Sequence, residues 1–73
     1  MPIKIDDDVM RLEIDGTVLA TARKRVDGWW EVSYWPRFCD RHQAITALTI
    51  TELLDSGRDS SDPLVRALRE ELR

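Results

Sequence analysis

Two Asp-Gly pairs, Asp15-Gly16 and Asp27-Gly28, constrain the fold of this chain more than any other feature of its sequence. A two-residue type I′ turn needs positive φ at both central positions, and Asp-Gly is among the pairs that adopt it most readily. Residues on both sides of each pair alternate between apolar and polar, which is typical of half-buried strands. The sequence therefore predicts two consecutive β-hairpins, which together form a three-stranded antiparallel meander.

The alternation also predicts which face of each strand is buried. The three strands span residues 9–15, 17–25 and 29–35, and successive side chains of a strand point to opposite faces. The predicted inward residues are, strand by strand, Met10, Leu12 and Ile14; Val18, Ala20 and Ala22; Trp30, Val32 and Tyr34. Because the middle strand supplies small residues between larger ones, we expect a trough in the sheet that receives a helix.

A helix is predicted at residues 40–56, directly after the sheet. Pro36 ends the third strand because proline cannot donate to the ladder. Asp40 and Gln43 have the spacing of a capping box, in which side chains at both positions satisfy amides of the first turn. Ser56-Gly57 supplies a stop signal.

The apolar residues of this helix cover most of its circumference and leave a narrow polar strip near His42, Thr46 and Thr49. A helix of this kind is covered on more than one side, and the sheet can cover only one. Asp62-Pro63 starts a second helix, at residues 62–73, as N-cap and first helical residue. Its stripe of Leu64, Val65, Leu68 and Leu72 is expected to cover the other side.

The chain is thus predicted to be one small α+β domain over residues 1–73, with the order βββαα. It consists of an N-terminal segment (1–8), a three-stranded sheet (9–36), a central helix with one side on the sheet, and a C-terminal helix. Its composition, 42% hydrophobic and 34% charged residues, is that of a globular domain. No apolar run approaches the ~20 residues of a membrane span. The single cysteine, Cys39, excludes an internal disulfide and favours a cytoplasmic location.

No sequence pattern indicates an enzyme, a metal site or a cofactor site. Cys39 and His42 have a spacing that could hold two metal ligands, but a closed site needs about four. The acidic run at residues 6–8 lacks the spaced ligands of a calcium loop and is read as a solvated turn. We therefore expect a non-enzymatic protein without a bound metal or cofactor.

The sheet face opposite the core is the predicted interaction surface. This face would carry Trp29 and Trp35, whose large apolar rings are unfavourable to leave exposed to water. Tryptophan and arginine are enriched at binding hot spots. The candidate residues are Arg11, Arg23, Arg25, Trp29, Trp35 and Arg37. Such a face favours a protein partner or a homodimer. Two structural alternatives remain: residues 1–8, with Ile3 and Ile5, fold over this face, or the tryptophans lie at sheet edges against arginine stems.

A DNA-binding accessory role is the alternative function. Three antiparallel strands followed by a helix, over residues 9–55, resemble the plant AP2-type and integrase arm-binding modules. That resemblance implies that arginines and tryptophans of the exposed sheet face enter the major groove. Glu13, Asp27 and Glu31 lie among these arginines, and the net charge of −3 disfavours nucleic acid, whose binding requires phosphate neutralisation.

The run from Trp35 to Thr49, with its "DR-x-QAITALT" helix start after a Trp-rich strand, resembles small uncharacterised proteins of actinobacteria and their phages. This resemblance implies a cytoplasmic or mobile-element protein and no particular mechanism. The sequence as a whole favours a small cytoplasmic module that binds a protein partner or itself.

Overall fold

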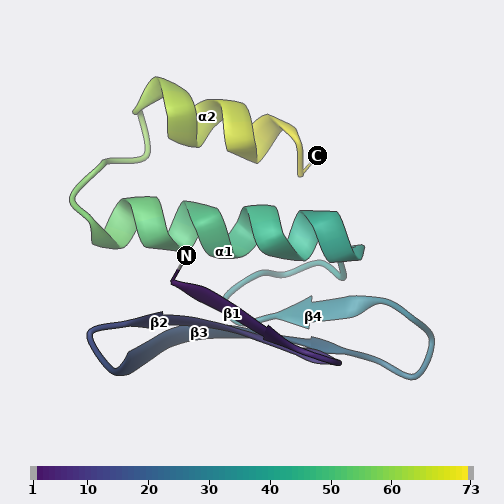
Figure 1. The fold of residues 1–73 in the computed structure, drawn as a ribbon. Helices are drawn as coiled ribbons and strands as arrows, with labels where there is room; N and C mark the ends of the chain where they lie inside the picture. The colour runs from purple at the N-terminus through teal and green to yellow at the C-terminus, as the bar shows by residue number, and fades with distance from the viewer. Residues whose placement is uncertain (1, 73) are drawn as a thin grey trace.

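The computed structural model describes residues 2–72 and shows an α+β fold in three layers: sheet, helix, helix (Figure 1). The elements are β1 (Ile3–Asp6), β2 (Val9–Ile14), β3 (Thr17–Lys24), β4 (Trp30–Val32), α1 (Arg41–Asp55) and α2 (Pro63–Glu70). The sheet order is β1-β2-β3-β4, and each strand pairs antiparallel with the next. The predicted meander and the two helices after it are confirmed.

The prediction of three strands is wrong, because residues 3–6 form a fourth strand at the edge of the sheet. In the register of β1 with β2, Ile3 lies opposite Leu12 and Ile5 opposite Met10. Both isoleucines therefore share the face that α1 covers, and the alternative in which this segment folds over the opposite face is wrong. The exposed residues Asp7 and Asp8 form the turn between the two strands.

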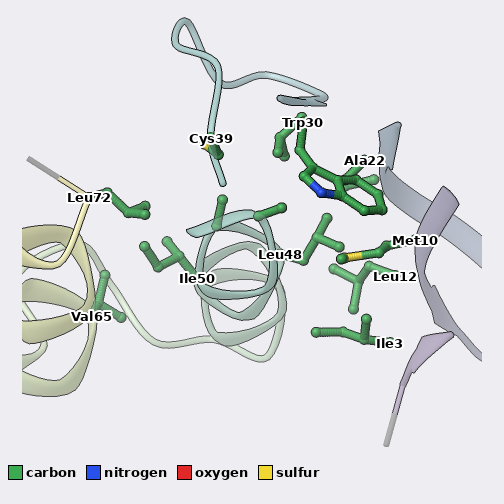
Figure 2. Close-up of a cluster of buried hydrophobic side chains, with 14 residues drawn as sticks. Ile3, Met10, Leu12, Ala22, Trp30, Cys39, Leu48, Ile50, Val65 and Leu72 are labelled. Atoms are coloured by element: carbon green, nitrogen blue, oxygen red, sulfur yellow. The ribbon is translucent and has the colours of Figure 1, made fainter. Parts of the chain in front are cut away.

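The inward face of the sheet carries most of the residues predicted for it. Those confirmed as buried are Met10, Leu12, Ala20, Ala22, Trp30 and Val32. The alanines of β3 leave the expected trough, and α1 lies over it with Leu48 directed at the sheet residues (Figure 2). Short middle side chains thus allow the helix to approach the sheet between bulkier neighbours.

An irregularity in the ladder corrects the prediction for Val18. The register of β2 with β3 shifts between Leu12 and Glu13, as a β-bulge does. An extra residue in one strand reverses the alternation beyond it, so Val18 is 47% exposed while Leu19 packs against the core. Ile14, at the far end of β2, is half-buried and also packs against the core.

The chain leaves the pleat of β4 after Val32, which corrects the prediction for Tyr34. Tyr34 has a φ of 66° and is 89% exposed, so it does not belong to the core. The Trp35 amide donates to the Val32 carbonyl at 3.1 Å and closes this turn. The strand is therefore much shorter than the aromatic run that suggested it.

The start of α1 agrees with the sequence. The Asp40 carboxylate accepts from the Gln43 amide at 2.8 Å, and the Gln43 side chain accepts from the Asp40 amide at 3.0 Å, which completes the capping box. The expected polar strip is wrong at Thr46, which is buried, and its hydroxyl donates to the His42 carbonyl at 3.1 Å. A hydroxyl satisfied in this way can be buried without losing a hydrogen bond.

The second helix covers the side of α1 that faces away from the sheet, as predicted. The Asp62 carboxylate caps α2 by accepting from the Leu64 amide at 2.9 Å. Val65 and Leu72 are buried on the Ile50 side of α1 (Figure 2), whereas Leu64 is 46% exposed. Within residues 2–72, neither helix has the length and apolar character to span a membrane.

Candidate interaction surface

The sheet face away from α1, here called the open face, carries two rows of side chains that cross the strands. Both helices lie on the other side of the sheet (Figure 1). The register places one row at Lys4, Arg11, Thr21 and Ser33, and the next at Asp6, Val9, Arg23 and Glu31. The open face is thus mostly polar, and a hollow on it is lined by Thr21, Arg23, Glu31, Val32 and Ser33.

Charges of both signs are interspersed on this face. Lys4 Nζ lies 3.5 Å from Glu13 Oε1 in an exposed ion pair, and Arg23 lies opposite Glu31 in the register. In the adjacent row, the hydroxyl oxygens of Thr21 and Ser33 are 3.1 Å apart. The face is therefore not uniformly cationic.

An aromatic–arginine patch, formed by Arg25, Trp29 and Phe38, lies where β3 leads into β4. The Arg25 guanidinium carbon is 4.3 Å from the centre of the Phe38 ring, well within the range of a cation–π contact. The Arg25 amide donates to the Trp29 carbonyl at 2.7 Å. Both aromatic side chains are about half exposed, Trp29 at 49% and Phe38 at 51%.

Asp27 orders two members of this patch. Its Oδ2 accepts from Arg25 Nε at 3.3 Å, and its Oδ1 accepts from the Trp29 amide at 3.1 Å. The third member, Phe38, is positioned by the neighbouring Cys39, which exchanges two backbone hydrogen bonds with Trp30, at 2.7 and 2.9 Å. The patch is thus held by backbone pairing and by one carboxylate.

The structure places the six predicted residues in four different environments. Arg11 and Arg23 lie in the rows of the open face, and Arg25 and Trp29 lie in the patch. Arg37 is exposed in the loop that precedes Phe38. The expectation that Trp35 faces away from the core is wrong.

Trp35 is half-buried and packs against the core, because the turn at Tyr34 redirects the chain. Phe38 is the residue that sequence reasoning missed. The sequence gives little indication of its role, because Phe38 precedes the buried Cys39 in a segment with no strand pattern of its own. Only the pairing of Cys39 with Trp30 brings its ring beside Arg25.

The groups considered for chemistry lie away from this surface or in unsuitable surroundings. Cys39 is 2% exposed, and burial, aided by the neighbouring Asp40 carboxylate, raises the pKa of its thiol. A raised pKa keeps the thiol protonated near neutral pH, where the thiolate is the nucleophile. Within residues 2–72, no three side chains of His, Cys, Asp or Glu gather in a way that could hold a metal ion.

No protein-family model matches this chain, and no curated protein or solved structure matches it. The resemblance to actinobacterial and phage proteins stays a prediction. The geometry of the described residues therefore carries the functional argument.

Proposed function

We propose that this chain is a small non-enzymatic module that binds a protein partner or a second copy of itself. A protein partner docks on the aromatic–arginine patch and the adjoining open face. The half-exposed pair Trp29 and Phe38 beside Arg25 carries this proposal. A few residues supply most of the binding energy at protein interfaces, and tryptophan and arginine are enriched among them. The single buried cysteine supports a cytoplasmic location.

The order within the patch favours binding because little side-chain freedom remains to be lost. The stacked Arg25 and the two contacts of Asp27 restrain groups that would otherwise become ordered on association. Each immobilised flexible side chain costs roughly 0.5–1.5 kcal/mol on binding, so a patch ordered beforehand avoids part of that cost.

The test compares the wild-type chain with a Trp29→Ala/Phe38→Ala variant in quantitative capture from a bacterial cytosolic extract. We expect specific partners to be lost from the variant. Tyr34→Ala is the matched control, because it removes an aromatic ring that is 89% exposed and lies beyond the other end of β4. An identical set of captured proteins for all three chains would refute the assignment of this patch.

A DNA-binding accessory function is a second candidate, favoured by the position of Arg11 and Arg23 on one uncovered sheet face with Arg25 next to them. Glu13 and Glu31 on the same face weigh against it. A mobility-shift titration with mixed-sequence DNA tests it, since phosphate contacts are strongest at low salt. Absence of binding at low salt would exclude this candidate.

A further inference from the structure

The two edges of the sheet differ in how their backbone groups are satisfied. At the outer edge of β4, Trp30 exchanges two hydrogen bonds with Cys39, and the Val32 carbonyl accepts from the Trp35 amide. At the other end of the sheet, β1 has β2 on one side, and residues 2–72 supply no neighbouring strand on its outer side. The described part of the chain thus covers one edge with a loop and leaves the other edge open.

The register shows which groups of β1 point outward. The Glu13 amide donates to the Pro2 carbonyl at 3.0 Å, so Pro2 and Glu13 form a hydrogen-bonded pair. Such pairs alternate along an antiparallel ladder. The backbone N–H and C=O groups of Lys4 and Asp6 therefore point toward β2, and those of Ile3 and Ile5 point away from it. Pro2 does not block the outer edge, because its nitrogen lies on the β2 side.

We propose that β1 pairs antiparallel with β1 of a second copy of this chain, about a two-fold axis at Ile5. The two Ile5 residues exchange their outward N–H and C=O groups, and the two sheets join into one. This inference deepens the self-associating part of the proposed function by naming the partner and the contact. It uses a surface separate from the aromatic–arginine patch.

Charge complementarity identifies a second copy as the occupant of this edge. With the axis at Ile5, Lys4 of each chain lies opposite Asp6 of the other, and both side chains belong to the open face. Opposite charges in directly facing positions stabilise a strand pair, and like charges destabilise it. The neighbouring register, with Ile3 opposite Ile5, places Lys4 opposite Lys4 of the second copy.

Burial and symmetry support the same contact. Ile5 is 46% exposed although it faces the α1 side of the sheet, and the two-fold pairing brings it against its own copy. A two-fold contact uses each β1 edge once and ends at the covered β4 edges, so the assembly closes as a dimer. The axis is perpendicular to the sheet, and the two aromatic–arginine patches therefore lie on one surface.

Sedimentation velocity of the full chain, from micromolar to about 1 mM, measures the dimer, whose Kd we expect within that range. Ile5→Pro removes an outward N–H that has no acceptor among residues 2–72, so the monomer should stay folded, as its circular dichroism will report. We expect Ile5→Pro to weaken dimerisation at least about tenfold. A wild-type chain that is strictly monomeric at 1 mM overturns the proposal.

Charge variants test the register independently of proline. Asp6→Lys places like charges opposite each other twice and should weaken the dimer about tenfold, whereas the Lys4→Asp/Asp6→Lys reversal should recover most of the loss. Asp8→Lys is the matched control, because it makes the same charge change in the exposed turn outside β1. Equal dimerisation of Asp6→Lys and the wild type overturns the proposed register.

The outcomes separate this inference from the proposed function. Self-association that survives both Ile5→Pro and Asp6→Lys overturns the β1 contact and leaves a self-associating module. Dimerisation that is lost with Trp29→Ala/Phe38→Ala also overturns it, because the patch would then form the interface. Dimerisation that depends on β1 and is unchanged in the patch variant supports the inference.

Discussion

Replacement of Tyr34 by glycine is expected to stabilise the fold, although it removes a large aromatic side chain. Tyr34 has a φ of 66°, in the left-handed region, and its side chain is 89% exposed. The left-handed conformation costs a residue with a Cβ roughly 1–2 kcal/mol. Glycine avoids this cost, but its greater freedom in the unfolded chain returns about 0.5–1 kcal/mol.

The net effect of Tyr34→Gly is therefore an increase of about 0.75 kcal/mol in the free energy of unfolding, within a range of about 0–1.5 kcal/mol. For a domain of this size, such a change raises Tm by about 2–8 °C. Urea denaturation followed by circular dichroism measures the free energy, and a thermal melt measures Tm. Tyr34→Ala is the essential companion, because it removes the same ring and keeps the Cβ.

The comparison of glycine with alanine isolates the backbone effect. At position 34, glycine should be more stable than alanine. At Arg37, which is exposed in the same loop and is not among the described residues of positive φ, the order should reverse. If Tyr34→Ala were at least as stable as Tyr34→Gly, the left-handed turn would not be a source of strain, and the account of how β4 ends would be wrong.

Three further perturbations test contacts of the two helices and of the loop between them. Asp40→Ala removes the capping box of α1 and should lower the free energy of unfolding by about 1 kcal/mol, measured by urea denaturation. Asp55→Ala in the last turn should cost nothing, since a carboxylate there opposes the helix dipole. Equal effects of the two substitutions would contradict the capping argument. Val65→Ala removes fully buried methyl groups between α2 and α1 and should cost about 1.5–3 kcal/mol, against a smaller loss for the half-exposed Leu64→Ala. The Ser61 hydroxyl and backbone amide donate to the Asp59 carboxylate and hold the pKa of this carboxyl below its ordinary value of 3.8. The contribution of Asp59 to the stability of the fold is therefore present above its pKa in the unfolded chain and is lost as the pH falls through its pKa in the folded chain. An NMR titration of Asp59 with a midpoint at or above 3.8 would contradict this, and Asp59→Asn should remove that part of the acid dependence.

Features encoded by neighbouring residues could be predicted from the sequence. The Asp15-Gly16 turn, the Asp40/Gln43 capping box and the alternation in β2 each depend on a few residues close together, and all are present in the structure. The second Asp-Gly pair also lies in a turn, but only Gly28 has a positive φ there. The Gly28 amide donates to the Arg25 carbonyl at 3.0 Å, so this loop includes Val26 and the predicted two-residue turn is wrong at this position. Features that depend on pairing between distant residues could not be predicted from the sequence. The four residues of β1 are too few for a clear pattern, and their strand exists because β2 offers an edge with the right register.

The candidate surface divides in the same way. Arg25 and Trp29 follow from the alternation around the second Asp-Gly turn and are in place. The prediction for Trp35 is wrong because the alternation of the strand does not continue through Tyr34, where the backbone turns instead. Phe38 could not be found at all, since its position depends on the long-range pairing of Cys39 with Trp30.

The three tryptophans lie at three different depths, which makes the chain its own spectroscopic reporter. Trp30 is 3% exposed in the core, Trp35 is half-buried, and Trp29 is 49% exposed in the patch. A small neutral quencher should therefore reach Trp29 first and Trp30 last. A ligand on the patch should change the emission of Trp29 alone, whereas unfolding should shift all three to longer wavelength, so intrinsic fluorescence can separate binding from loss of structure without any label.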